Sequence, residues 1–476
     1  MLVALALFNH SNNRWGIYSP DRLHFVDDIQ VNRFALKTWH ILDNPDQYDC
    51  LLMGSSRVEM IDSAQLPGRC YNFTHSGGTP RDHRLALEQF ARAGVELQRV
   101  YIGLDEFSYI QDPDEGETQM MRRPPPATWL EWLTFHATFL LHFPGQRDWE
   151  IFNGNEPRVP IDWYVLAPEN HLPEMRRKAQ ANLQEADVHD QRLYRLPATY
   201  WSERNNIDSA LQDIQQIVAL SESMGFELVL FFNPLHYKTY LQQHLDRLER
   251  FKRGVVAYAP LLDFTGLTPE SLDNRLWYET SHYSTAMGDF MVPYLRGEQL
   301  LEPPHGRLLT AATLEQGLAL GYQQDITQLL THDKFRGGQL IPAQLGQLLL
   351  SQGSESPLAP PTMTLEGIRQ SGQHWIADAP GGSVVLSGFC APNHLAVYDV
   401  ALDEPQRSFL YSPGYLGERR QRYFLPAGRQ RLHLLVNGLG CDERVRYSPF
   451  PARGHLQLLQ ASHHALSPVA GATAQP

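Results

Sequence analysis

Unbroken apolar runs of strand length alternate with longer segments that carry an apolar stripe at helical spacing through the first 300 residues. Runs such as 98–104 and 227–232 end in several consecutive apolar residues, which predicts strands buried on both faces. Strands alternating with helices predict a parallel sheet covered on both sides, with ligands bound beyond the C-terminal strand ends. The expected strands are 48–54, 69–73, 98–104, 227–232 and 255–264, and the expected helices are about 80–94, 205–224 and 285–296.

With 476 residues, the chain is longer than one hydrophobic core supports, so we expect more than one domain. We assign residues 1–300 to an α/β domain. The alternation breaks down at about 110–200, where Pro124-Pro-Pro and several tryptophans indicate an inserted helical region. Two interpretations of this insertion are open: a lid or substrate wall, and a peripheral subdomain with no role in a site.

The pattern changes again in the last third of the chain. We expect residues 301–360 to form a helical linker region. Beyond it, short runs such as 381–389 and 431–436 are separated by Gly, Pro and Asn turns. These runs predict an antiparallel β-sandwich over 361–464, for which a carbohydrate-binding module is one interpretation. The composition of residues 465–476 predicts a disordered tail.

Charge and cysteine usage exclude several classes of partner. The net charge is −13 and no run rich in Lys or Arg is present, so we expect no nucleic-acid partner. The four cysteines form neither a CxxC motif nor a Cys/His cluster, so we expect no metal site and no cofactor. Two interpretations of the cysteines are open: four free buried thiols, or, in an exported protein, a Cys390–Cys441 disulfide beside the remaining Cys50 and Cys70.

The first eight residues, Met1 to Phe8, form an apolar run. The run is too short to span a bilayer, and no stretch of about 20 apolar residues is present elsewhere. It is interpreted either as a buried first strand or as the tail of a signal anchor. The abrupt change to polar residues at Asn9 favours the second interpretation and a periplasmic or other extracytoplasmic location, with membrane anchoring through a truncated N-terminal segment.

Two short motifs contain the residues that could perform chemistry. Gly54-Ser55-Ser56-Arg57 follows a buried strand, where a serine hydroxyl and the backbone N–H groups of a following helix face the same point. His282 precedes an expected helix, and Glu279 lies three residues earlier, close enough to hold one nitrogen of the imidazole ring. Each motif alone is common, but serine and histidine in this order on an α/β sheet indicate a serine nucleophile with its base.

These motifs resemble the SGNH (GDSL-like) hydrolase superfamily over about residues 45–300. The similarity is to the branch with Gly-Ser-Ser or Gly-Thr-Ser in place of Gly-Asp-Ser, which includes alginate O-acetyltransferases and the teichoic-acid D-alanylation protein. The resemblance implies that Ser56, rather than Ser55, is the nucleophile, with His282 as base and Glu279 in the place of the usual aspartate. It also implies an oxyanion hole formed by Ser56, by Gly77 with Gly78 as the alternative glycine, and by the position of Asp105.

Asp105 departs from the family pattern, because the motif Gly103-Leu104-Asp105-Glu106 has an aspartate where the family has an asparagine. An ionised carboxylate accepts hydrogen bonds only and would repel an oxyanion. The loss of one such donor typically costs about 3–4 kcal/mol. Asp105 is therefore expected to be protonated, to point away from the site, or to have another role.

Two further residues are candidates for the pocket. His236 follows an expected strand at the same sheet edge, and is interpreted either as lining the pocket or as a loop histidine bonded to backbone. Arg57 is expected either to bind an acidic group of the substrate or to pair with a nearby carboxylate such as Glu59.

Two functions follow from these observations. The first is a serine-dependent O-acyl (acetyl) transferase or esterase that acts on a cell-envelope or secreted polysaccharide, with a membrane acyl-donor protein as a second expected partner. The alternative is a catalytically degenerate protein of the same fold that binds glycans or acts as a scaffold in polysaccharide assembly.

Overall fold

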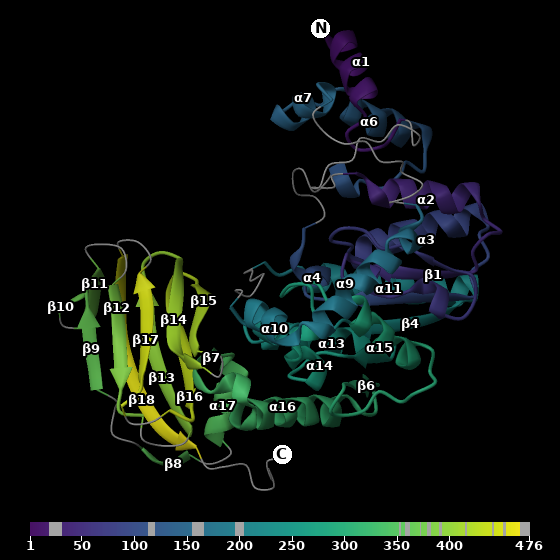
Figure 1. Cartoon of the computed structure of the whole chain (residues 1–476). Helices are drawn as coiled ribbons and strands as arrows, with labels where there is room; N and C mark the ends of the chain where they lie inside the picture. Colours follow the sequence, from purple (N-terminus) through teal and green to yellow (C-terminus); the bar gives the residue numbers. More distant parts are fainter. Residues whose placement is uncertain are drawn as a thin grey trace.

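The computed structural model describes most of the chain (Figure 1). The described residues are 1–18, 31–112, 120–154, 166–195, 204–351, 354–357, 362–371, 373–377, 382–389, 393–414, 417–439, 442–450 and 454–466. The expected tail falls almost entirely outside them, and Ala465 and Leu466 belong to the last strand, β18 (Gly454–Leu466).

The N-terminal two thirds of the chain contain the expected parallel sheet. Its strand order is β2-β1-β3-β4-β5-β6, in which β1 to β5 pair in parallel and β6 pairs antiparallel with β5. The α/β class is therefore confirmed. The strands are β1 (Cys50–Gly54), β2 (Cys70–Asn72), β3 (Arg99–Leu104), β4 (Glu227–Phe232), β5 (Leu261–Asp263) and β6 (Arg307–Leu309).

Both faces of this sheet are buried, because each strand is apolar at consecutive positions. Leu51 and Met53 of β1 pack into one cluster with α3 (Pro80–Ala93), α11 (Ile207–Met224) and α13 (Leu245–Val256). Cys50 and Leu52 point to the other face and pack with α15 (Thr285–Leu295). Successive side chains of a strand point to opposite faces of the sheet. A strand that is covered on both faces therefore needs apolar residues at every position.

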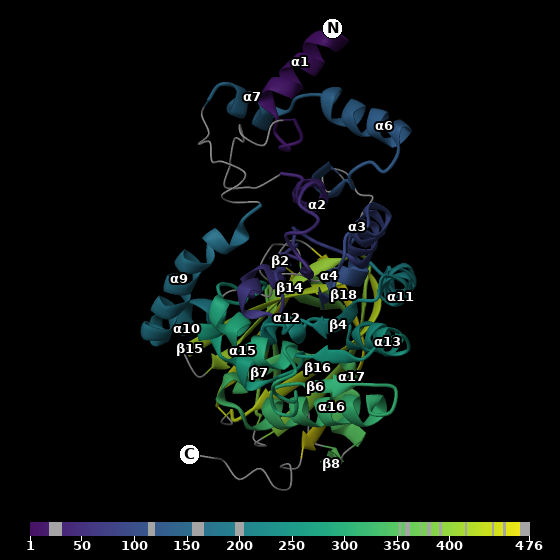
Figure 2. The ribbon, with the colours of Figure 1, turned by 90° about the vertical axis from the view of Figure 1, so that its right-hand side faces the viewer.

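The region of the expected insertion contains helices, as do its flanks (Figure 2). A short helix, α4 (Phe107–Ile110), precedes it, and α2 (Arg33–Asp43) lies earlier in the chain. The helices of the region are α6 (Trp129–Leu140), α7 (Gln146–Phe152), α9 (Leu172–Gln184) and α10 (Ala186–Arg195).

Two short helices and a second group of strands follow the parallel sheet. The helices α12 (Tyr237–Tyr240) and α14 (Pro269–Leu272) lie in the loops after β4 and β5. The C-terminal strands form antiparallel sheets in the orders β10-β11-β18-β13-β16-β7 and β15-β14-β17-β12-β9, an arrangement compatible with the expected sandwich. These strands are β9 (Thr362–Glu366), β10 (Arg369–Ser371), β11 (His374–Ala377), β12 (Gly382–Ser387), β13 (Asn393–Leu402), β14 (Gln406–Gly414), β15 (Gly417–Leu425), β16 (Gly428–Asn437) and β17 (Arg444–Phe450).

The segment 301–360, expected as a helical linker, contains strands as well as helices. Its helices are α16 (Leu314–Thr331) and α17 (Ala343–Ser351). Between them, β7 (Gly337–Ile341) pairs with β16, and after α17, β8 (Ser354–Pro357) pairs with β18. The segment therefore contributes strands to the C-terminal sheets as well as β6 to the parallel sheet, because strands far from it in the chain supply the backbone partners.

One of the two interpretations of the N-terminal run and one expected strand boundary are wrong. The N-terminal run forms a helix, α1 (Leu2–Asn12), and not a buried strand, and Leu2, Val3 and Leu7 are exposed. In the expected strand 255–264, only Leu261–Asp263 is extended, because the preceding residues complete α13 and its turn. Among the described residues, no helix has both the length and the apolar character needed to cross a membrane.

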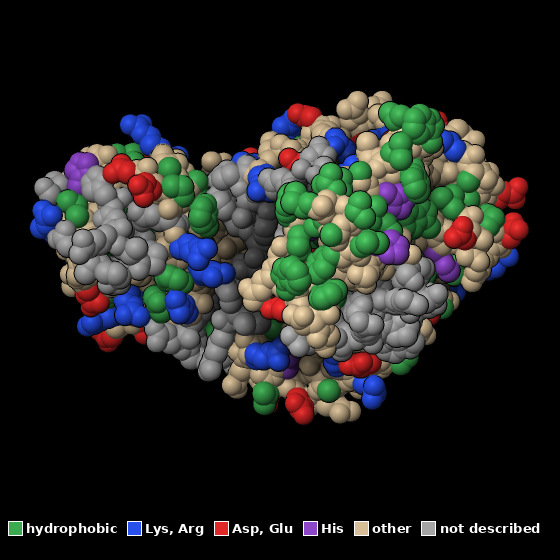
Figure 3. Space-filling model, turned by 90° about the horizontal axis from the view of Figure 1, so that it is seen from above, with side chains coloured by type: hydrophobic (Ala, Val, Ile, Leu, Met, Phe, Trp, Pro, Cys, Tyr) green, Lys and Arg blue, Asp and Glu red, His purple; other side chains and the backbone are tan. Residues whose placement is uncertain are grey.

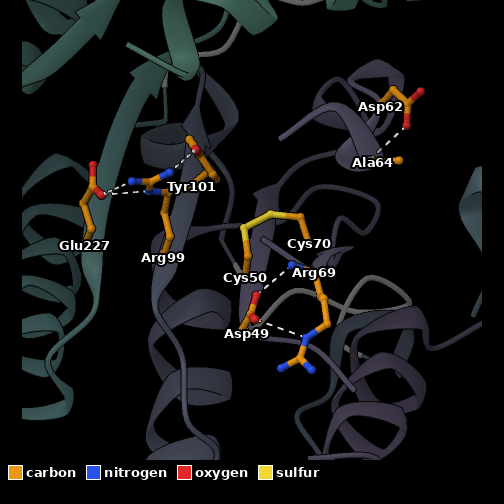
Figure 4. The surroundings of a disulfide bond; sticks show 9 residues. All are labelled: Asp49, Cys50, Asp62, Ala64, Arg69, Cys70, Arg99, Tyr101 and Glu227. Carbon is orange, nitrogen blue, oxygen red and sulfur yellow. Dashed lines mark hydrogen bonds and ion pairs between the residues drawn. A yellow bond between two sulfur atoms is a disulfide. The ribbon is translucent and has the colours of Figure 1, made fainter. Parts of the chain in front are cut away.

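A disulfide joins the first residues of β1 and β2 (Figure 4). Cys50 and Cys70 are direct partners in the parallel register, which brings the two sulfur atoms together. An ion pair of 3.1 Å between Asp49 and Arg69 lies beside the bond. The interpretation as four free thiols is therefore wrong for this pair, while Cys390 and Cys441 lie outside the described residues.

We expect the variant C50A/C70A to be less stable than the wild type by about 3 kcal/mol, because a cross-link of this loop length restricts the unfolded chain by about that amount. Urea unfolding, with and without a reductant, measures the effect. The reductant should lower the unfolding free energy of the wild type and leave that of the variant unchanged. Equal stability of the wild type and the variant without reductant would contradict the assignment.

Candidate active site

The candidate site lies where the strand order of the parallel sheet reverses. The chain passes from β1 outward to β2 on one side and then to β3 on the other, so the loops after β1 and β3 separate from each other. Such a switch point is the usual ligand-binding position in doubly wound sheets. Ser56 follows β1 and Asp105 follows β3, so both residues lie at this edge.

Close backbone packing shapes the turn that presents Ser56. Gly54 has φ 153°, and a Cβ atom at this residue would lie 2.5 Å from Cγ2 of Val58 and 3.0 Å from the carbonyl oxygen of Gly103. On the other side, a Cβ atom on Gly78 would lie 2.6 Å from the Gly54 carbonyl oxygen. Glycine at position 54 therefore lets the turn pack against Val58 and β3, and glycine at position 78 lets the loop after β2 pack against the turn.

Ser56, His282 and Glu279 form a continuous hydrogen-bonded chain. The Ser56 Oγ atom lies 2.9 Å from Nε2 of His282, although the two residues are 226 positions apart. The other ring nitrogen of His282, Nδ1, is hydrogen-bonded to Oε1 of Glu279. Because a carboxylate only accepts, we assign the proton to Nδ1, which leaves the lone pair of Nε2 directed at the serine hydroxyl.

The loop that carries His282 is held by its own backbone and by Glu279. The Glu279 carboxylate also accepts from the backbone N–H groups of Ser281 at 2.8 Å and His282 at 2.7 Å. Burial raises the pKa of Glu279, but the hydrogen bonds and charge of His282 and these backbone donors outweigh it, so that the pKa lies below its ordinary value. Glu279 is therefore a carboxylate at neutral pH and fixes the orientation of the imidazole ring.

The two neighbouring serines differ in their surroundings. Ser56 is half-buried, whereas Ser55 is 1% exposed and donates from its Oγ to Oδ2 of Asp105 at 2.5 Å. Ser55 is thus directed into the protein, and Ser56 is the serine beside the histidine.

Asp105 lies beneath the turn and is 0% exposed. Besides the bond from Ser55, its Oδ1 atom accepts from the backbone N–H of Phe107 at 3.0 Å. Of the roles expected for Asp105, the structure shows that it points away from the half-buried Ser56 hydroxyl. The oxyanion role implied by the family pattern does not fit this placement, because the carboxyl group is enclosed and used inside the protein.

Arg57 is also enclosed, and its guanidinium joins three loops. It is 1% exposed and forms a two-bond ion pair with Glu106, in which Nη2 donates to Oε1 at 2.6 Å and Nη1 donates to Oε2. Its Nε atom donates to the carbonyl oxygen of Ser281 at 2.8 Å, next to His282. Arg57 therefore pairs with a carboxylate, as one interpretation expected, but with Glu106 and not with Glu59, which pairs with Arg33 at 3.2 Å.

The two candidate glycines of the oxyanion hole differ in the use of their N–H groups. The N–H of Gly78 donates to the carbonyl oxygen of His75 at 3.2 Å and is therefore occupied within the turn. Gly77 is half-buried with φ 62°, and among the described residues its N–H has no hydrogen-bond acceptor. This difference favours Gly77 over Gly78 as a donor, while its role stays a prediction.

His236 is 0% exposed, so it does not line an open pocket. Its Nε2 atom lies 2.8 Å from Oδ1 of Asn274, and its Nδ1 atom accepts from the backbone N–H of Lys238 at 3.3 Å. Burial lowers the pKa of His236 well below its ordinary value, so the ring is neutral. The interpretation as a loop histidine bonded to backbone is the one that this geometry supports.

Sequence reasoning missed Glu106 and the backbone of Ser281 as partners of Arg57. The signal for Glu106 was present: an arginine next to a buried strand needs a carboxylate, and two acidic residues follow β3 in succession. Nothing in the motif identified the Ser281 carbonyl. Among the described residues, no group of His, Cys, Asp and Glu side chains could hold a metal ion.

Comparisons with known proteins identify no family for the chain. No family model matches it, and no curated protein matches it. Matched solved structures include an uncharacterized protein from Listeria monocytogenes EGD-e, at 11% identity and a TM-score of 0.19 over 23% of this chain and 12% of that one. They also include a carbohydrate-binding module of Cellvibrio mixtus lichenase 5A in complex with cellotriose, at 13% identity and a TM-score of 0.18 over 23% of this chain and 100% of the module.

A third match is a family two carbohydrate esterase from Clostridium thermocellum, at 14% identity and a TM-score of 0.17 over 22% of this chain and 33% of that one. The chain spans between 12% and 25% of the lengths of the first three matched proteins. Carbohydrate-binding modules and carbohydrate-active enzymes thus recur among these matches, at a similarity too low to assign an activity.

Asp105 gives a test of this geometry. Burial, opposed in part by the Arg57 guanidinium, raises the pKa of Asp105 from 3.8 to about 6. The folded protein therefore binds this proton more tightly than the unfolded chain, and the free energy of unfolding should fall by about 3 kcal/mol as pH rises from about 4 to about 6. In the variant Asp105→Asn this fall is absent, so its stability relative to the wild type should rise over the same window. Urea unfolding across this pH range measures the difference, and a flat difference would contradict the buried placement.

Proposed function

We propose that this protein is a serine-dependent O-acyl transferase or esterase of the SGNH type that acts on a cell-envelope or secreted polysaccharide. The observation that carries the proposal is the chain from Ser56 through His282 to Glu279, with 2.9 Å between the hydroxyl oxygen and Nε2. A hydroxyl, an imidazole in a fixed tautomer and an ionised carboxylate are the parts that acyl transfer through a serine ester requires.

The reaction has two halves. As Ser56 Oγ bonds to the carbonyl carbon of the ester, His282 Nε2 takes its proton and the carbonyl oxygen becomes an oxyanion. When the oxyanion collapses, the bond to the leaving oxygen breaks, His282 returns the proton to that oxygen, and an acyl ester on Ser56 remains. In the second half, His282 deprotonates an acceptor hydroxyl or water, which takes the acyl group and restores Ser56. The nature of the acceptor decides between transfer and hydrolysis.

The oxyanion would be stabilised by the backbone N–H groups of Ser56 and Gly77. Asp105 adds no donor, because its carboxyl group is enclosed beneath the turn. Each such donor is worth about 3–4 kcal/mol, so a site with two donors is expected to be slower than one with three.

The exposure of the catalytic base supports a polymeric substrate, and the disulfide bond supports a location outside the cytoplasm. The side chains of His282 and Glu279 are 38% and 35% exposed, so the base lies at an open surface that a glycan chain can reach. The Cys50–Cys70 disulfide supports an oxidising compartment such as the periplasm. A membrane acyl-donor protein is part of this proposal as the source of the acyl group.

The second candidate function is a glycan-binding or scaffold protein with an inactive site. The placement of Asp105 is the observation that favours it, because the family's asparagine donor has no substitute at this position. The two functions differ in whether Ser56 is a nucleophile.

We expect a fluorophosphonate probe to label Ser56 in the wild type and to leave Ser56→Ala unlabelled. Hydrolysis of an aryl acetate should fall about a thousandfold or more in Ser56→Ala, and about a hundredfold or more in Glu279→Gln, because glutamine does not stabilise the imidazolium or fix the required tautomer. Mass spectrometry of the labelled peptide and steady-state kinetics measure these effects.

Ser223→Ala is the matched control, since Ser223 is an exposed serine of α11 whose hydroxyl, among the described residues, bonds to the carbonyl of Leu220 at 3.0 Å and to no other group. This variant should retain labelling and turnover. A wild type that takes no label and has no turnover would favour the glycan-binding function.

A further inference from the structure

The helices α1, α6 and α7 form one end of the molecule, away from the parallel sheet (Figures 1 and 2). Of the twenty large apolar side chains that are exposed in the described part of the chain, twelve lie on these helices or the turns that join them. We call this surface the apolar tip. Its members are Met1, Leu2, Val3, Leu7, Trp129, Leu130, Trp132, Leu133, Leu141, Phe143, Trp149 and Phe152.

Helix α6 is apolar on opposite faces. Its inner face places Phe135 and Phe139 against Trp15, where they are buried. On the opposite face, Leu130 and Leu133 are 57% and 49% exposed. Trp129 and Trp132, in the first turn, are 72% and 53% exposed. A helix with apolar side chains on two opposite faces is normally covered on both of them, by protein or by lipid. The outer face of α6 therefore has the character of a surface covered by something apolar.

The apolar tip is held in place by buried polar contacts. The Asn9 side chain donates to the carbonyl oxygens of Leu140 at 2.9 Å and His142 at 2.7 Å. Arg14 and Asp148, both buried, form an ion pair of 3.0 Å. These contacts join segments more than 130 positions apart and fix the three helices to one another. The exposed apolar side chains are therefore held in fixed positions on one surface.

Charged residues are few on the three described helices of the apolar tip. Helix α1 contains no Asp, Glu, Lys or Arg. Glu131, the charged residue of α6, accepts from the backbone N–H groups of Ala127 at 2.8 Å and Thr128 at 3.3 Å and so caps its own helix. In α7, Arg147 pairs with Glu150 at 3.2 Å. The charges of α7 are therefore paired, and Glu131 is the one unpaired charge on the described helices of the apolar tip. So few charges suit a lipid phase better than a protein partner selected by charge.

Figure 3 looks down on this end of the molecule and shows hydrophobic side chains gathered over the larger lobe, with few charged groups among them. We propose that the apolar tip inserts into the interface of a lipid bilayer and docks the protein on the membrane surface. Tryptophan and phenylalanine side chains are favoured at the boundary between headgroups and acyl chains, and helices lying in this plane bury an apolar face there. The docking is driven by apolar burial, since the net charge of −13 repels anionic lipid.

The test is flotation of the whole chain with vesicles of phosphatidylcholine, at low and at high salt. The wild type should float with the vesicles at both salt concentrations. The variant W129S/W132S should show about tenfold less bound protein or lower, because each tryptophan contributes a large apolar side chain to the bound state. Both residues are exposed, so the substitutions leave the core intact.

The matched control is Y258S/F424S, which removes two aromatic side chains that are 40% and 38% exposed on other parts of the molecule. It should float like the wild type. Labelling of Ser56 by the fluorophosphonate should be the same in both variants as in the wild type, since none of the four residues belongs to the site. This readout separates failure of membrane docking from failure of the proposed activity.

Three outcomes would overturn membrane docking. The wild type would remain at the bottom of the gradient, or W129S/W132S would float as well as the wild type. In the third outcome, the wild type would not float, and light scattering would show a dimer that the double substitution dissociates. The apolar tip would then be an interface between two copies of the chain.

Discussion

A buried guanidinium connects the parts of the candidate site. Arg57 leaves the turn after β1, pairs with Glu106 after β3 and donates to the carbonyl of Ser281, one residue before His282. A buried charge without a partner would cost several kcal/mol, so the fold tolerates Arg57 only while these loops keep their positions. Ser56 and His282 lie next to these contacts, and their separation therefore depends on the same ion pair.

The sheet and the serine–histidine pair could be predicted because both follow from local patterns. Consecutive apolar residues in β1, β3 and β4 indicate burial on both faces, and parallel strands carry their following loops to one edge. The contact of Asp105 with Ser55 and that of Arg57 with the Ser281 carbonyl could not be predicted. Each residue has several acceptors or donors within reach, and the partner it takes depends on a loop that is 50 to 224 positions away in the chain.

Short apolar runs were the other source of error. A run of eight apolar residues is compatible with both a strand and a helix. The N-terminal run forms α1, whose apolar side chains stay exposed at one end of the molecule. The segment 337–341 looked like part of a helical region, yet it forms β7, because β16 supplies hydrogen-bond partners from about a hundred residues further on. The pattern of residues in a short segment gives no information about a pairing strand so far away in the chain.

The position of β7 decides where the C-terminal part of the chain can be cut. β7 covers one side of β16 by backbone pairing, and the Tyr423 hydroxyl oxygen accepts from the Leu340 N–H at 3.2 Å, which connects β7 to the second sheet. A fragment that began at residue 361 would lack β7 and would leave the backbone N–H and C=O groups on that edge of β16 without hydrogen-bond partners. Exposed edges of this kind recruit strands from other molecules, so the fragment would be prone to aggregation. A fragment intended for glycan-binding assays would therefore start before Gly337.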